Sequence, residues 1–470
     1  MNNYHSDTFS LINLIEDKDE HYTDLYYQHV NPVQMDMLGI IGFDRRFIKG
    51  KGAYVWDNKG AKYLDFLSGF GIFNMGRNHP TIKKVVREYL SLDDPWKLAM
   101  GTNRLAGFLA EALLNKVPHL DKVYFANTGT ECVETALKFC RTATGKETVV
   151  YANNGFHGLT YGSLSMNGSQ KFRKGFGRFL PGTKNVPLND LDRLKQVFDK
   201  EDVAGVILEP IQGKGVYPAH EEYLLGVQRL CKKHHAVMIL DEIQTGMGRT
   251  GTLFCYQHIS DLEPDMVLVS KSLSGGMVPV GAVLMREHIY KSVYSSLDRG
   301  KIHSSTFGEG GLAMACGLAS LHVIESESLS EHAEQIGTYL LQELQRMVSR
   351  YKFLKEVRGK GLMIGIEFEN PPSIPLKPAW HFTHLGKQSL FPQSVIMPLI
   401  EQHHILTQVA AHNVDIIKIL PPLTINKKDA DWFLDSFRQT LNQIETFSGP
   451  VWSLAKHFTT FKIRSIKEKQ

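Results

Sequence analysis

The middle of the chain alternates short runs of β-branched and aliphatic residues with longer amphipathic stretches of helical spacing. This alternation is typical of stacked βα units, and it predicts an α/β fold with a mainly parallel sheet. The expected strands lie at 123–125, 148–151, 203–208, 237–240 and 266–269. Polar residues follow each of them, and ligands of such sheets bind beyond the carboxyl ends of the strands. We therefore expect the functional residues in these turns.

Composition and charge narrow the class of protein. A chain of 470 residues that is 43% hydrophobic is long enough for roughly two or three domains. Its 53 basic and 49 acidic residues leave a net charge of only +4, which does not favour nucleic-acid binding. The five cysteines lack disulfide or zinc-site spacing, and the first residues lack a secretory signal pattern. We therefore expect a cytoplasmic protein that acts on small molecules and holds no metal.

Near residue 336 the alternating pattern ends. A charged helical stretch, a Pro-rich stretch at 371–378 and a final helix follow, and this change predicts a second, smaller domain. The segment 456–469 interleaves lysine and arginine with aromatic and aliphatic residues. A solvated or subunit-packed tail is favoured there over a membrane-surface helix, because chain termini are commonly of that kind.

Two carboxylates, Asp241 and Glu242, follow the expected strand at 237–240. An acid in that position is suited to pair with the protonated ring nitrogen of a pyridine cofactor, which keeps the ring an electron sink. An Asp that caps the following turn is an equally good interpretation of this motif alone.

Lys271 follows the next expected strand, at 266–269, and precedes Gly275 and Gly276. A lysine that burial and cationic neighbours make partly neutral is the residue type that forms Schiff bases. A lone lysine at a strand end is most often a surface residue. Here the acids upstream and the glycines downstream favour the reactive interpretation.

Two further turns fit a cofactor of this kind. The Thr-Gly-Thr turn at 128–130 precedes an expected helix at 132–141 and offers backbone N–H groups, hydroxyls and a helix dipole to a phosphate. A plain capping box of Thr128 and Glu131 has the same pattern. Phe156 lies between two glycines, where its ring could lie flat against a ligand ring or pack as a core aromatic in a tight turn.

In this order the motifs resemble those of the class III (ornithine and ω-amino acid type) aminotransferases, a family of pyridoxal-phosphate (PLP) enzymes of fold type I. The resemblance extends from about residue 40 to 445. Five motifs carry it, and they begin at Asn127, Phe156, Glu209, Asp241 and Ser270.

The resemblance implies a large domain with a mainly parallel seven-stranded sheet and a smaller α+β domain. In this division, residues 1–65 are an N-terminal segment that joins the small domain, and residues 66–335 form the large PLP-binding domain. Residues 336–446 form the C-terminal small domain, and 447–470 are a basic tail.

The resemblance also implies pyridoxal 5'-phosphate as the cofactor, carried by Lys271 as a Schiff base. Lys271 and Asp241 are the implied catalytic residues, and Thr306 would complete the site of the other subunit in a homodimer. The implied cofactor-binding residues are Gly129, Thr130, Phe156, His157, Glu209, Asp241, Gln244, Lys271 and Thr306.

The implied reaction transfers an amino group from a small-molecule donor to an oxo acceptor. The ornithine and acetylornithine enzymes carry Gln-Gly-Glu and an arginine before the small-domain Pro-Pro, where this chain has Lys214 and Lys418. A lysine is a point charge and does not replace the planar fork with which arginine grips a carboxylate. We therefore expect a terminal amine, diamine or ω-amino acid as one substrate, and an oxo acid or aldehyde as the other. Lys418 and Arg249 are candidate substrate residues, although Arg249 in a structural salt bridge is an equal alternative.

Three alternatives remain at this point. One is an ornithine or acetylornithine type of aminotransferase, and another is an aminomutase or racemase on the same scaffold, which would share Lys271 and Asp241. The third is a protein that binds the cofactor without useful catalysis, whose signature would be loss of one of these two residues; both are present.

Overall fold

The structure is a computed structural model. It describes residues 9–96, 100–370, 380–381, 383–384, 390–411 and 414–446. The Pro-rich stretch at 371–378 and the basic tail at 447–470 lie outside the described residues.

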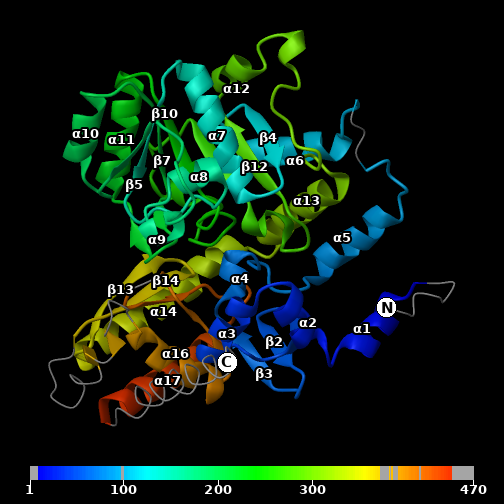
Figure 1. Cartoon of the computed structure of the whole chain (residues 1–470), viewed down its shortest axis with the longest axis vertical. Coiled ribbons are helices and arrows are strands. Elements are labelled where there is room, and N and C mark those ends of the chain that lie inside the picture. Colours follow the sequence, from blue (N-terminus) through cyan, green and yellow to red (C-terminus); the bar gives the residue numbers. More distant parts are fainter. Residues whose placement is uncertain are drawn as a thin grey trace.

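A seven-stranded sheet forms the centre of the large part of the molecule, shown in green and cyan in Figure 1. Its strand order is β4-β12-β11-β10-β7-β5-β6, and only β12 runs antiparallel to its neighbours. The strands are β4 (Lys122–Ala126), β5 (Thr148–Ala152), β6 (Thr183–Val186), β7 (Val203–Leu208), β10 (Val237–Asp241), β11 (Met266–Val269) and β12 (Gly281–Met285). All five strands expected from the sequence fall within elements of this sheet, which confirms the mainly parallel arrangement.

Both faces of this sheet are buried. Along β10, Met238 and Leu240 belong to one apolar cluster, and Val237 and Ile239 belong to the other. Strands covered on both faces need apolar residues at every position, which explains the continuous aliphatic runs in the sequence. The helices of this part of the molecule are α5 (Pro80–Leu90), α6 (Arg104–Leu114), α7 (Gly129–Thr144), α8 (Tyr161–Ser165), α9 (Gln170–Arg173), α10 (Leu191–Phe198), α11 (Glu221–Lys233), α12 (Glu287–Val293) and α13 (Gly311–Ser326).

The two ends of the chain pack together in the lower part of Figure 1. One four-stranded sheet has the order β1-β2-β3-β15 and joins N-terminal strands to β15, from the C-terminal part. A second has the order β13-β14-β17-β16. The strands are β1 (Phe47–Lys51), β2 (Tyr54–Asp57), β3 (Lys62–Asp65), β13 (Leu354–Lys360), β14 (Met363–Phe368), β15 (Ile405–Leu406), β16 (Gln408–Val409) and β17 (Ile416–Ile419).

Helices accompany these sheets at both ends of the chain. They are α1 (Leu11–Lys18), α2 (Tyr22–His29), α3 (Pro32–Ile40), α14 (Leu329–Arg350), α16 (Phe391–Glu401) and α17 (Lys427–Thr446). A domain boundary at residue 336 would cut α14, so we propose that the small domain begins where this helix begins. None of the helices in the described part of the chain has the length and apolarity that a membrane span requires.

Candidate active site

The site lies at the carboxyl edge of the large sheet, where β5, β7, β10 and β11 are neighbours and run parallel. His157 follows β5, Glu209 follows β7, Asp241 ends β10 and Lys271 follows β11. Four motifs that are far apart in the sequence therefore meet at one edge, as the strand-end rule predicts.

Asp241 is buried and is held in a fixed orientation. Its Oδ2 lies 2.8 Å from His157 Nδ1, and its Oδ1 accepts a hydrogen bond from the Ile243 backbone N–H at 3.1 Å. Burial by itself would lower the pKa of His157, but the hydrogen bond and the charge of Asp241 raise it above its usual value. His157 Nε2 is buried and has no hydrogen-bond partner among the described residues.

The neighbouring acid, Glu242, serves the packing of the fold. Its Oε1 accepts from the Tyr256 backbone N–H at 2.8 Å, and its Oε2 accepts from the Thr245 hydroxyl. Burial raises the pKa of Glu242 to about 7. Of the two carboxylates at the end of β10, the structure therefore pairs Asp241 with His157 and gives Glu242 local structural partners.

Lys271 begins a short 3₁₀ turn, η2 (Lys271–Ser274), with a left-handed backbone at φ 42°. A non-glycine residue in this region is strained, and such strain occurs often at functional sites. Burial lowers the pKa of Lys271, although the charges of Asp241 and Glu209 oppose that shift. A larger neutral fraction makes its amine a better nucleophile toward an aldehyde. Gly275, with φ 63°, permits the turn that follows.

The Thr-Gly-Thr turn lies at the start of α7. Thr128 caps the helix by accepting from the Glu131 backbone N–H at 3.3 Å. The Glu131 side chain accepts from the Asn127 backbone N–H at 2.6 Å and not from that of Thr128, so only half of the expected capping box forms. A Cβ at Gly129 would stand 2.8 Å from Ile243 Cδ1, which places this helix start against the loop that follows Asp241. The capping role and a phosphate-binding role are compatible, because the remaining N–H groups of the first turn still lack helical partners.

Thr130 lies in a hydroxyl cluster that the sequence did not predict. Its Oγ1 is 2.7 Å from both Thr160 Oγ1 and Ser163 Oγ, and Ser163 N–H donates to Glu134 Oε1 at 3.0 Å. A Cβ at Gly158 would come within 2.4 Å of Thr130 Oγ1, so the close approach of the two segments requires glycine there. No sequence signal marks Thr160 or Ser163, because folding alone brings them to the turn.

Glu209 accepts hydrogen bonds from two loops at this edge of the sheet. Its Oε1 accepts from the Phe156 backbone N–H at 2.9 Å and its Oε2 from the Gly213 N–H at 2.7 Å. Burial raises the pKa of this carboxyl. Glu209 therefore fixes the loop that presents the half-buried Phe156 ring and the loop that carries Lys214.

Lys418, on β17, is 3% exposed and has protein partners on two sides. Its Nζ donates to Gly213 O at 2.7 Å and to Gln244 Oε1 at 3.2 Å, while Gln244 Nε2 donates to Phe70 O at 2.8 Å. Burial, together with the charges of Lys214 and Lys271, lowers the pKa of Lys418 to about 7. The Lys418 amine therefore lies at the candidate active site, where its hydrogen bonds are to Gly213 and Gln244 of the protein itself.

Arg249 and Thr306 lie differently from the other candidates. The Arg249 side chain is fully buried, and its guanidinium donates to Leu362 O at 3.0 Å, to Pro421 O and to Asn74 Oδ1 at 2.6 Å. Its partners are protein oxygens, and among the described residues it forms no ion pair of the kind considered from the sequence. A side chain this deeply buried presents no surface to a ligand. Thr306 is exposed.

The residues at this edge fit PLP. Gly129 and Gly158 let the α7 start pack closely against Ile243 and the segment after His157, and the first turn of α7 offers backbone N–H groups that lack helical partners. A buried acid and a lysine of lowered pKa lie at the ends of the adjacent strands β10 and β11. Among the described residues, no group of three or more His, Cys, Asp or Glu side chains is arranged to hold a metal ion. The fold and the site together define a PLP-dependent enzyme of fold type I.

Comparison with known proteins narrows this class. The model of the family "Aminotransferase class-III" matches residues 43–441, and the chain belongs to that family. Acetylornithine aminotransferase of Bacillus cereus is 39% identical over 387 residues, which cover 82% of this chain and 92% of that protein. Aminotransferase PigE of a Serratia species is 34% identical over 457 residues, or 90% of this chain and 54% of PigE, so this chain spans about half the length of PigE.

Solved structures agree with this assignment. The ornithine aminotransferase of Toxoplasma gondii superposes with a TM-score of 0.80 at 27% identity and covers 93% of this chain and 99% of its own. A PLP-bound amine transaminase from an uncultivated Pseudomonas species gives a TM-score of 0.76 at 25% identity, with 85% of this chain and 95% of its own covered. The chain is therefore a PLP-dependent aminotransferase of class III.

Proposed function

We propose that this enzyme transfers an amino group from a terminal amine, diamine or ω-amino acid to an oxo acid or aldehyde. The observation that carries this proposal is that the Lys418 amine is buried, hydrogen-bonded to protein oxygens and lowered in pKa. Lys418 occupies the place where ornithine and acetylornithine enzymes are expected to have a carboxylate-gripping arginine. Its amine is bound to Gly213 O and Gln244 Oε1 and has a pKa of about 7. Such a group offers a weak and non-planar grip on an α-carboxylate.

The proposed cofactor contacts follow from the placement of the side chains. Lys271 would bind PLP covalently, Asp241 would face the ring nitrogen with His157 behind it, and Phe156 would lie against the ring. Gly129 and Thr130 would hold the phosphate at the start of α7. Glu209 and Gln244 would shape the walls of the ring site.

The chemistry divides between the cofactor and this chain. PLP supplies an aldehyde and an electron-accepting ring when it is bound. Asp241 would keep a proton on the ring nitrogen, and the hydrogen bond from His157 would hold the Asp241 carboxylate in place for that purpose. Lys271 would move the proton at the substrate carbon, because burial lowers its pKa and so increases the fraction of neutral amine that can accept a proton.

Steady-state assays with a panel of donors test the substrate proposal. We expect putrescine or another simple ω-amine to give a higher kcat/KM than ornithine or acetylornithine. The reverse order would contradict the argument from Lys418. It would favour the ornithine or acetylornithine type, which the 39% identity to the Bacillus cereus enzyme supports.

A second control separates transfer from isomerisation on the same scaffold. An aminotransferase needs a carbonyl acceptor for continued turnover, whereas an aminomutase or racemase does not. Sustained product formation without any added oxo compound would assign the chain to the latter class.

We also propose a cytoplasmic homodimer with shared active sites, in which Thr306 of one subunit reaches the phosphate of the other. Its exposure and the adjacent hydrogen bond from Asn127 Nδ2 to Ser305 Oγ, at 2.6 Å, support this arrangement. All five cysteines are free and buried, in keeping with a reducing compartment. Analytical ultracentrifugation tests the dimer, and a Thr306→Ala variant that keeps the dimer but binds PLP more weakly would support the shared site.

A further inference from the structure

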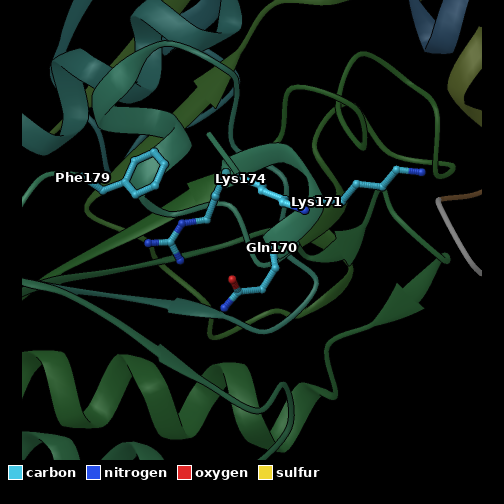
Figure 2. A pocket seen from close by; sticks show the side chains of 5 residues that line it. Gln170, Lys171, Lys174 and Phe179 are labelled. Atoms are coloured by element: carbon cyan, nitrogen blue, oxygen red, sulfur yellow. The ribbon is translucent and has the colours of Figure 1, made fainter. Parts of the chain in front are cut away.

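A basic segment borders a cavity beside α9. Residues 170–179 contain Lys171, Arg173, Lys174 and Arg178 and no acid. The cavity has a volume of about 630 Å³ and is lined by Gln170, Lys171, Arg173, Lys174 and Phe179. Figure 2 shows the two lysines extending from α9 and the turn that follows it, with Phe179 across from them. The volume lies within the usual range for small-molecule pockets, about 300–1,000 Å³.

The cations of this cavity are not neutralised by the protein. Within the described ranges, the side chains of Lys171 and Lys174 make no hydrogen bond or ion pair, and both residues are exposed. Arg173 lies over the Phe179 ring at 4.6 Å and donates to the Tyr151 hydroxyl at 3.4 Å, and its Nε is buried without a partner in the described structure. Uncompensated positive charge with aromatic surface suits an amphipathic anion.

Phe172, on the same helix as three of the residues that line the cavity, contacts an aromatic ring of the candidate active site. Its ring meets that of Phe156 edge to face, with centroids 5.6 Å apart. Lys214 Nζ lies 4.9 Å from the Phe156 centroid and 5.3 Å from that of Phe172. Burial lowers the pKa of Lys214, the nearby charge of Glu209 opposes that shift, and no carboxylate forms an ion pair with this lysine among the described residues.

Lys214 also lies near the lysine that is expected to bind the cofactor. Lys214 is close enough to Lys271 for its charge to lower the pKa of Lys271. Lys418 is engaged by Gly213 O and Gln244 Oε1, so Lys214 is the better placed of the two lysines to receive a substrate anion.

We propose that the α9 cavity is an anion-binding subsite of this enzyme. It takes the carboxylate or phosphate end of an elongated carbonyl substrate, with Lys171 and Lys174 at the outer end of the path and Lys214 at the inner end. This inference rests on the proposed function in one respect, because it assigns the anionic end to the amino acceptor.

Paired acceptors of equal chain length test the subsite. With holoenzyme and a saturating diamine donor, kcat/KM is measured for 6-oxohexanoate and for hexanal. In the Lys171→Met/Lys174→Met variant we expect the preference for 6-oxohexanoate to fall about tenfold, the lower end of what charge focusing in a cleft supplies. The matched control is Lys232→Met/Lys233→Met, an exposed lysine pair at the end of α11, which should leave the preference unchanged.

An unchanged preference in the α9 variant, or an equal loss for both acceptors, would overturn the subsite. If the wild-type holoenzyme converts neither acceptor, the proposed function fails, and calorimetric titration still decides the subsite. Binding of glutarate or inorganic phosphate that weakens in the α9 variant and not in the control would support it. Lack of binding to the wild type, or equal binding to all three proteins, would refute it, and the tighter of the two probes identifies carboxylate or phosphate as the preferred group.

Discussion

Replacement of Lys418 by methionine should change how the stability of this protein depends on pH. In the folded chain the amine of Lys418 has a pKa of about 7, against 10.5 for an ordinary lysine. Between these pH values the unfolded state therefore binds one more proton than the folded state. The free energy of unfolding then rises by about 1.4 kcal/mol for each pH unit, because the folded state favours the neutral amine and deprotonation becomes easier as the pH rises.

The size of this effect follows from the two pKa values. At pH 7 the Lys418 amine disfavours the folded state by about 4 kcal/mol, and at pH 9 by about 2 kcal/mol. Methionine has a similar length and no titratable group. Its loss of the hydrogen bonds to Gly213 O and Gln244 Oε1, about 1 kcal/mol each, does not depend on pH in this range.

Urea unfolding of wild type and Lys418→Met at pH 7 and pH 9, at equal protein concentration, measures this effect. From pH 7 to pH 9, we expect the free energy of unfolding of the wild type to rise by about 2 kcal/mol more than that of the variant. All other titrating groups are common to both proteins and cancel in the comparison. Equal changes in the two proteins would show that Lys418 does not titrate in this range, and the reasoning from its burial would be refuted.

Three further changes test the site. Lys271→Ala should abolish the visible absorbance of lysine-bound cofactor and lower kcat at least about 100-fold, as expected for loss of a proton-transferring group; a retained band would contradict the assignment. Asp241→Asn should lower kcat about 100-fold and also lower the pKa of His157, which NMR titration detects, because the negative charge beside the imidazole is removed. Gly158→Ala should weaken PLP binding in equilibrium dialysis, since its Cβ would meet Thr130 Oγ1 at 2.4 Å and its φ of 126° disfavours alanine; unchanged affinity would place the phosphate elsewhere.

The central sheet and the edge that bears the site were predictable because their signals are local. Each strand of the sheet core is a continuous apolar run, and the residue that follows it carries the chemistry. Asp241 and Lys271 could be placed near each other without information on distant contacts, because adjacent parallel strands have their carboxyl ends at the same edge of the sheet.

The partners of these residues were not predictable, because they come from distant parts of the chain. Lys418 meets Gly213 across 205 positions of sequence and Gln244 across 174. Arg249 donates to Pro421, 172 positions away, so nothing near it in sequence distinguishes a buried structural arginine from one that faces a substrate. Burial of such side chains depends on how the small and large parts of the molecule meet, and a single sequence does not encode that in any periodicity.

The parallel pairing of β3 with β15 has a consequence for how this chain is made. Leu64 N–H donates to His404 O at 2.8 Å and Phe66 N–H to Leu406 O at 2.9 Å, so an early strand receives its neighbour only from near the end of the chain. At about 5–20 residues per second, a ribosome takes roughly 20–70 s to synthesise the roughly 340 residues between them. During that interval the N-terminal hairpin presents an unpaired edge to the cell, and the large sheet is complete long before it. Nascent chains released before residue 406 would keep that edge unpaired.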